Sequence, residues 1–367
     1  MTRVLRAAVA AVASVALLAG CATASDPVGS IEASPPAVDT RPLSELTPYD
    51  DPRAAQGPRT AVASNHVVEP VEGDYPQTLP ATVTSHDPGG DALVTITDTS
   101  RVIALDMAGS LAATVWGLGM GDSLVGRDMS TTFPGIEELP VVTSGAHAVN
   151  AESVLALRPT LVLTDGSIGP RDVLEQLRDS GVTVVFLTNE ASLEGAVQLA
   201  RDTAAALGVV EAGDALAERI ATQIADVRAQ IDAIAPRAHE DRVRVVFLYL
   251  RGASGIYYLF GAESGADHLI EALGARDVAA ELGWEGMRPM TDEAMIQADP
   301  DVVLVMTNGI ASAGGVDGLL EAKPALALTR AGQNRRIIDM ADGELLSFGP
   351  RTALVLEALA RALYTEP

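Results

Sequence analysis

The sequence predicts an α/β protein built from two lobes that one long helix joins. Three observations predict it. Short apolar runs alternate with helical patterns along two stretches of the chain, 91–208 and 237–367. An unbroken helical pattern separates these stretches. A helix–proline–strand segment of the first stretch recurs in the second.

Residues 1–21 have the pattern of a lipoprotein signal peptide. Arg3 and Arg6 precede an apolar stretch that is too short to span a bilayer. The run Leu17-Leu18-Ala19-Gly20-Cys21 then places the only cysteine where a bacterial lipoprotein signal is cut and lipidated. An ordinary secretory signal with an incidental cysteine is the alternative. We expect export, membrane contact only through a lipid on Cys21, and no internal disulfide.

Residues 22–90 differ in composition from the rest of the chain. They hold 11 of the 21 prolines and show no periodic apolar pattern. This composition predicts a disordered tether, in which His66 and His86 are solvated. The formal charge of the whole chain is −24, which argues against a nucleic-acid partner and against polybasic contact with a membrane.

The stretch 91–208 alternates strands and helices. Buried strands are predicted at 161–163 and 182–187, because both runs are apolar and short. Helices are predicted near 108–118, 150–157, 170–180 and 191–207. This alternation favours a mainly parallel sheet with both faces covered.

Residues 209–236 predict the connecting helix. Its apolar residues recur every three or four positions, at Leu216, Ile220, Ile224, Val227, Ile231 and Ile234. The helix lacks internal proline and ends at Pro236. At 1.5 Å per residue it would span roughly 40 Å.

The stretch 237–367 starts a new α/β pattern. Strands are predicted near 243–250, 256–260, 302–306 and 336–339. Helices are predicted near 263–273, 291–298, 315–321 and 349–364.

An internal repeat relates the two stretches. Residues 151–163 match residues 292–304 at an offset of 141 positions, and each copy has a glutamate in the first turn of its helix. One copy lies on each side of the connecting helix. We therefore predict two Rossmann-like α/β lobes with a ligand cleft between them.

A known family shares these features. An exported lipoprotein with two α/β lobes and one helical connector resembles the substrate-binding proteins of ABC importers for haem, iron-siderophores and cobalamin. Four segments carry the resemblance: Val125-Gly126-Arg127-Asp128, 151–163, 286–293 and Ser347-Phe348-Gly349-Pro350-Arg351-Thr352. Within this family the chain most resembles the hemin-binding lipoproteins of actinobacterial haem uptake, through His147 and the run Tyr249-Leu250-Arg251-Gly252.

The resemblance implies a site for ferric haem. Tyr249 lies near a strand end and His147 on a loop before the repeated helix, so the two are candidate axial ligands of the haem iron from opposite lobes. Arg251 shares a strand face with Tyr249. The resemblance implies that its guanidinium hydrogen-bonds the phenolate and stabilises that charge.

Other residues of the second lobe are candidates for contact with the ligand. Met287 stands where relatives often carry a tyrosine, and Met306 ends a strand, so either methionine is a candidate wall of the cleft. Arg288 and Arg351 are candidate partners of the haem propionates. Trp284 and Tyr257 are weaker candidates for flanking residues.

The paired glutamates predict a partner. In the resembling family one glutamate on each lobe engages the two subunits of an ABC permease dimer, which works with an ATPase. Glu152 and Glu293 are the matching residues here. The simpler alternative is that each acid only stabilises the N-terminus of its helix.

Three other functions were weighed. A ferric-siderophore or cobalamin receptor of the same fold is the close alternative. Such a receptor would use an aromatic and arginine-lined cleft and would not need a tyrosine–histidine pair. An enzyme is disfavoured because G-x-S-x-G, H-E-x-x-H and a phosphate-binding loop are all missing. A zinc-binding lipoprotein is disfavoured because only three of the five histidines fall after residue 90.

Overall fold

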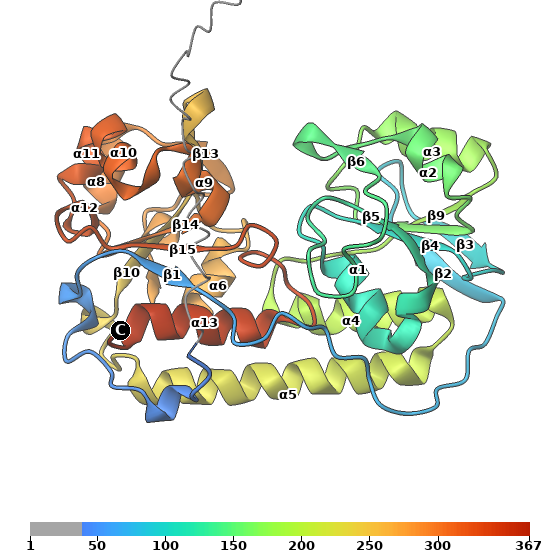
Figure 1. The fold of residues 1–367 in the computed structure, drawn as a ribbon, viewed down its shortest axis with the longest axis horizontal. Coiled ribbons are helices and arrows are strands. Elements are labelled where there is room, and N and C mark those ends of the chain that lie inside the picture. Colours follow the sequence, from blue (N-terminus) through green and yellow to red (C-terminus); the bar gives the residue numbers. More distant parts are fainter. Residues whose placement is uncertain (1–38) are drawn as a thin grey trace, which may run out of the picture. The chain divides into compact units, whose positions relative to one another are not determined.

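The computed structural model describes residues 39–367. The expected signal peptide, Cys21 and the first part of the expected tether lie outside these residues. Within them, two α/β lobes lie side by side and helix α5 (Val210–Ile234) runs beneath both (Figure 1). The predicted fold class is confirmed.

Lobe one is built on a four-stranded parallel sheet in the order β5-β4-β8-β9. Its two central strands, β4 and β8, are fully buried, as expected of a parallel sheet covered on both faces. Two small hairpins, β2–β3 and β6–β7, flank this sheet. The elements of lobe one are β2 (Ala81–Ser85), β3 (Ala92–Ile96), β4 (Val102–Leu105), α1 (Ser110–Val115), η3 (Trp116–Met120), η4 (Gly121–Ser123), β5 (Leu124–Arg127), β6 (Thr143–Ser144), η5 (Gly145–His147), β7 (Ala148–Val149), α2 (Ala151–Ala156), β8 (Leu161–Thr164), α3 (Arg171–Asp179), β9 (Thr183–Phe186) and α4 (Leu193–Leu207).

Lobe two is built on a mixed sheet in the order β1-β15-β14-β10-β11-β13, and β12 also pairs with β10. One face, with Phe247 and Leu304, joins the core that continues into lobe one. The other face, with Leu248 and Val305, packs under α8 and its neighbours. The elements of lobe two are η6 (His239–Asp241), β10 (Arg244–Arg251), η7 (Gly252–Ser254), β11 (Ile256–Phe260), α6 (Ala266–Ala272), β12 (Arg276–Asp277), α7 (Val278–Glu281), β13 (Met287–Pro289), α8 (Asp292–Ala298), β14 (Val302–Met306), α9 (Thr307–Ser312), α10 (Gly315–Ala322), α11 (Pro324–Ala327), α12 (Arg330–Gln333), β15 (Ile337–Met340) and α13 (Thr352–Tyr364).

The connecting helix α5 buries the apolar stripe that the sequence predicts. Leu216, Ile220 and Ile231 are almost fully buried, and each such side chain contributes about 1.5–3 kcal/mol to stability. Gly213 lets α5 approach α4, because a Cβ atom there would lie 2.3 Å from that of Ala204. Further along, α5 packs against α13 of lobe two. One continuous apolar core therefore runs through both lobes.

The internal repeat is also a structural repeat. The side chain of Asn150 accepts a hydrogen bond from the backbone N–H of Ser153 at the start of α2, and Thr291 accepts one from Ala294 at the start of α8. Both helices end on a residue with positive φ before a proline: Arg158 at 47° and Asp299 at 36°. These left-handed residues turn the chain sharply from the helix into β8 and β14.

Residues 39–90 correct the expectation of a disordered tether. Residues 39–80, the arm, form η1 (Leu43–Glu45), η2 (Pro52–Ala54) and β1 (Arg59–Ala61), and β1 pairs with β15 in parallel. Residues 81–85 form β2 of lobe one. The arm then crosses to lobe one, where the N–H of Val71 donates to the carbonyl of Gly117. Composition missed this arm because it has no core of its own and takes its hydrogen bonds and buried contacts from the two lobes.

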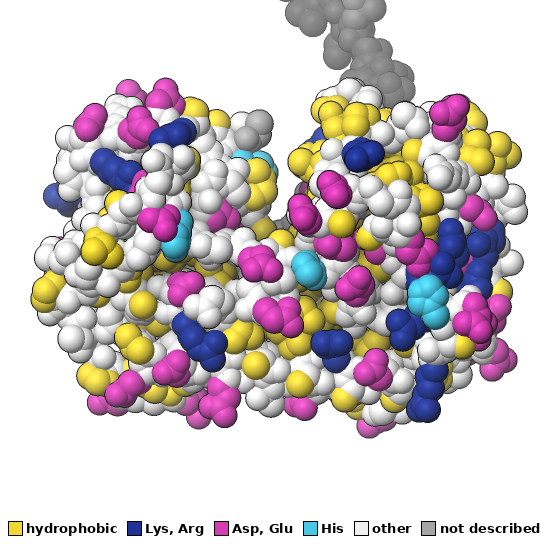
Figure 2. All heavy atoms as spheres, turned by 180° about the vertical axis from the view of Figure 1, so that it is seen from behind, with side chains coloured by type: hydrophobic (Ala, Val, Ile, Leu, Met, Phe, Trp, Pro, Cys, Tyr) yellow, Lys and Arg dark blue, Asp and Glu magenta, His cyan; other side chains and the backbone are white. Residues whose placement is uncertain are grey.

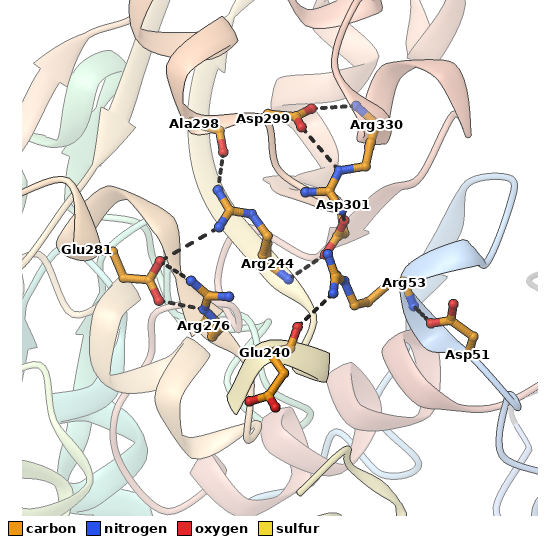
Figure 3. A network of polar contacts seen from close by, with 10 residues as sticks. All are labelled: Asp51, Arg53, Glu240, Arg244, Arg276, Glu281, Ala298, Asp299, Asp301 and Arg330. Carbon is orange, nitrogen blue, oxygen red and sulfur yellow. Dashed lines mark hydrogen bonds and ion pairs between the residues drawn. The ribbon is translucent and has the colours of Figure 1, made fainter. Parts of the chain in front are cut away.

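A polar network fastens the first part of the arm to lobe two (Figure 3). The buried carboxylate of Asp301 binds Arg53 of the arm at 3.0 Å and Arg330 at 2.9 Å, and it accepts from the backbone N–H of Arg244. Arg53 also donates to the carbonyl oxygen of Glu240 at 2.7 Å. Asp301 precedes β14, so this network lies at the amino ends of the strands.

Candidate functional site

The candidate site lies at the carboxyl ends of the strands. In an α/β sheet this edge is where ligands bind. Figure 2 shows a hollow between the two lobes, with acidic side chains spread over the visible face of both. Tyr249 in lobe two and His147 in lobe one both lie where a strand or hairpin meets this edge.

Tyr249 lies near the end of β10, between β14 and β11. Its half-buried ring stacks on Phe260 with 6.1 Å between the ring centroids. Tyr258 is its direct partner across the antiparallel pair, so both tyrosines share one face of the sheet. Phe260 and the sheet orient the ring of Tyr249 before any ligand binds.

Arg251 lies over the ring of Tyr249. The guanidinium carbon is 5.0 Å from the ring centroid, which is a cation–π arrangement. One guanidinium nitrogen is 3.5 Å from Asp342, the second residue after β15. The expected hydrogen bond from Arg251 to the tyrosine oxygen is not among the contacts of the described residues, and the arginine lies instead against the ring face and Asp342.

His147 is at the tip of the β6–β7 hairpin. Its φ of 58° is in the left-handed region, which few residues other than glycine adopt at no cost. The ring nitrogen Nδ1 lies 3.3 Å from the hydroxyl of Ser130. Because the Ser130 hydroxyl contacts Nδ1, it does not contact the other ring nitrogen, Nε2.

Two buried carboxylates lie beneath the site in lobe one, and one of them anchors the loop that carries Ser130. Asp128 accepts hydrogen bonds from the backbone N–H groups of Ser130 and Thr131, at 2.6 and 2.9 Å. Asp106, equally buried, accepts from Ser110 and Leu111 at the start of α1. Burial, with the nearby charge of Asp128 added, raises the pKa of Asp106 to about 7. Burial also raises the pKa of Asp128.

A chain of contacts beside the site joins the two candidate ligands from lobe to lobe. Gly343 follows Asp342 and lies against the carbonyl oxygen of Ser130, since a Cβ atom on it would come within 2.7 Å of that oxygen. Asp342 contacts Arg251, and Ser130 contacts His147. The segment after β15 therefore links the tyrosine side of the site with the histidine side.

Comparison with known proteins identifies the family of the chain. The profile of the family "Periplasmic binding protein" matches residues 103–343, which is more than half of the chain. The chain belongs to the periplasmic binding protein family.

Individual relatives share its length and fold. The "heme binding protein HmuT" is 38% identical, with a TM-score of 0.80 over 86% of this chain and 100% of that one. The periplasmic heme-binding protein RhuT of Roseiflexus sp. RS-1 is 36% identical, with a TM-score of 0.65 over 73% of this chain and 98% of that one. An uncharacterized ABC transporter substrate-binding lipoprotein, YvrC of Bacillus subtilis (strain 168), is 26% identical over 254 residues, 68% of this chain and 76% of that protein.

The two candidate methionines of this binding protein differ in position. Met306 ends β14 and is half-buried against the same core as Tyr249. Met287 pairs directly with Phe260 and so shares the face of Tyr249, but it is 63% exposed at the edge of the sheet. Met306 is the better placed of the two to form a wall.

Four weaker candidates are not brought to Tyr249. Arg288 pairs with Leu259 and therefore lies on the opposite face of the sheet. Arg351 is only 4% exposed and pairs with Glu344 at 3.4 Å, so it is not free to bind a propionate. Tyr257 and Trp284 pack with the core on the other face, where the amino group of Lys323 lies 3.9 Å from the ring centroid of Tyr257.

Three residues of the site were missed from sequence: Tyr258, Ser130 and Asp342. Strand alternation from Phe260 back to Ile256 would have placed Tyr258 on the correct face. Asp342 directly follows a predicted strand at its carboxyl end, which is a positional signal for a site residue. Ser130 had no signal, because its contact with His147 depends on the tertiary packing of two loops.

The described part of the chain contains no group of three or more histidine, cysteine, aspartate or glutamate side chains arranged to hold a bare metal ion. Within residues 39–367, no helix has the length and apolar character that crossing a membrane requires.

Proposed function

We propose that the protein is an extracytoplasmic substrate-binding protein that captures ferric haem between its lobes and delivers it to an ABC permease. One observation carries the proposal. Tyr249 is oriented at the carboxyl end of a central strand with a guanidinium over its ring, and loop contacts join it to His147 on the other lobe. The names of HmuT and RhuT as heme-binding proteins support haem as the ligand.

The residues present fit a haem ligand. Tyrosinate is a hard oxygen donor for ferric iron, and a neutral imidazole nitrogen binds haem iron well. Tyr258 and Met306, both half-buried, supply aromatic and thioether surface for a flat macrocycle, and the buried Phe260 supports the ring of Tyr249. Two solved variants of HmuT replace a tyrosine and an arginine that are two positions apart, which is the spacing of Tyr249 and Arg251.

The lipid anchor and the permease contact are part of the same proposal. Cys21 is proposed as the lipidated residue that keeps the protein at the outer face of the cell membrane. Glu152 and Glu293 are exposed in the first turns of α2 and α8 and occupy equivalent places in the two lobes. A permease dimer is two-fold symmetric, so a pair of equivalent acids suits two equivalent basic patches on it.

Haem titration tests the ligand assignment. Mature protein titrated with ferric haem should develop a Soret band that saturates at one haem per chain. Tyr249→Phe should abolish or greatly weaken this band, whereas His147→Ala should weaken binding less and shift the spectrum. Tyr75 and His239 lie away from the carboxyl ends of the sheet strands in both lobes. Tyr75→Phe and His239→Ala should therefore leave the titration unchanged.

The outcomes separate the alternatives. Saturable binding of a ferric siderophore or cobalamin without haem binding would replace haem as the ligand. Haem binding that survives Tyr249→Phe with an unchanged spectrum would show that another residue ligates the iron.

A further inference from the structure

Asp342 is held in place from three sides. Its Oδ1 accepts the backbone N–H of Asn308 at 2.9 Å, at the start of α9. Its Oδ2 lies 3.5 Å from the guanidinium of Arg251. The next residue, Gly343, is wedged against the carbonyl of Ser130 in lobe one. Asp342 is therefore a fixed anion beside the site and not a mobile surface acid.

The guanidinium of Arg251 lies between two partners, Tyr249 and Asp342. Its guanidinium is positioned over the face of Tyr249 and toward Asp342, with no hydrogen bond to the tyrosine oxygen among the described contacts. A guanidinium carries its five N–H donors in one rigid plane, so the position that brings one nitrogen toward Asp342 also sets where the other donors point. When Tyr249 ligates ferric iron as phenolate, Arg251 has two anions to satisfy instead of one.

We propose that Asp342 is a positioning residue that acts through Arg251: it draws the guanidinium away from the Tyr249 oxygen and so weakens haem binding. The inference rests on the proposed function. A delivery protein must release its cargo, and this ion pair supplies a built-in competitor for the arginine that stabilises the bound form. Because Asp342 and Arg251 are both partly exposed, solvent screens the competition and its effect is moderate.

Asp342→Asn tests the proposal with little disturbance of the fold. The asparagine oxygen still accepts the N–H of Asn308, whereas the negative charge beside Arg251 is removed. We expect haem to bind about three- to tenfold more tightly, and to transfer more slowly to apomyoglobin in stopped-flow mixing, as expected for removing one partly exposed charge contact. The tyrosinate-to-iron charge-transfer band should also shift, because Arg251 then donates to the phenolate oxygen.

Two controls make the result specific. Asp339→Asn removes an equal charge on β15, where Asp339 contacts Thr60 and Thr307 instead of Arg251. It should change haem affinity less than twofold. In an Arg251→Ala background, Asp342→Asn should have no effect on affinity, because the residue through which Asp342 acts is gone.

Three results would overturn the proposal. They are an unchanged or lower haem affinity in Asp342→Asn, an equal effect of Asp339→Asn, and an effect of Asp342→Asn that persists without Arg251. Failure of the unsubstituted protein to bind haem would instead overturn the proposed function, so the two failures are distinguishable.

Discussion

Gly343 of lobe two lies against the carbonyl oxygen of Ser130 in lobe one, so closely that a Cβ atom would come within 2.7 Å of it and 2.8 Å of the Thr132 hydroxyl. This contact sets the spacing between the segment after β15 and the loop beside His147. The connecting helix fixes the lobes at their base, and the glycine fixes them again next to the site. The distance between the lobes at the site therefore depends on having glycine at position 343.

Gly343→Ala is expected to destabilise the protein. The added methyl group meets a backbone carbonyl that cannot rotate away, so the loops must shift, at a cost of about 1–3 kcal/mol in the free energy of unfolding. Urea denaturation of the unliganded protein measures this cost. Gly89→Ala is the matched control, because the added Cβ atom meets only the flexible end of Arg171, at 3.4 Å. Equal stability of the two variants would contradict the close approach.

A buried acid, Glu344, contacts both the arm and Arg351. The Glu344 carboxylate lies 2.6 Å from His66 of the arm and 3.4 Å from Arg351. Glu344→Gln leaves the buried Arg351 guanidinium without its counter-charge, so we expect a loss of about 3 kcal/mol in the free energy of unfolding. His66→Ala removes only a partly exposed partner and should cost less than about 1 kcal/mol. Urea denaturation of both variants measures these losses. A larger loss of unfolding free energy in His66→Ala would show that Glu344 stabilises the protein mainly through His66.

Stability should fall as the pH rises toward neutral, because of Asp106. Burial raises its pKa to about 7 in the folded protein, above the ordinary value of 3.8. Between these values the folded state keeps a proton that the unfolded state releases, so the contribution is full below pH 3.8 and is lost as the pH rises through about 7. From pH 5 to pH 8, the wild-type protein should lose about 1–3 kcal/mol more in unfolding free energy than Asp106→Asn.

Urea denaturation at several pH values measures this difference. Asp277, whose pKa burial raises to about 6, contributes in the same direction in both proteins and so cancels in the comparison. Parallel pH profiles of the wild type and Asp106→Asn would show that Asp106 ionises normally in the folded state.

The paired glutamates make a prediction for transport in cells. Reversing both Glu152 and Glu293 to lysine should leave haem titration unchanged and abolish haem-dependent growth, because each lobe would repel a basic patch on the permease. Glu194→Lys, which reverses an exposed acid in the first turn of α4, is the control for loss of a helix-stabilising charge. Normal growth of the double variant at normal protein levels would mean that the two acids serve only their own helices.

Periodicity determined most of the architecture from the sequence alone. The stripe from Leu216 to Ile231 predicts α5 because burial along one helix face needs that spacing. The repeat at 151–163 and 292–304 predicts two lobes because the same local signals, a capped helix and then a buried strand, produce the same local structure. Placing Tyr249 at a strand end needed only the position of the predicted strand.

Tertiary structure decided what depends on contacts between distant segments. The arm at 39–80 is ordered because β15 leaves an unpaired edge for β1 and because the two lobes supply its other partners. Arg351 is buried against Glu344, and Arg288 is turned to the far face by the register of an edge strand. Arg251 rests between the ring of Tyr249 and Asp342, a choice that its spacing from Tyr249 left open. Sequence spacing fixes which face a side chain occupies, but its partner depends on which other segments the fold brings to that face.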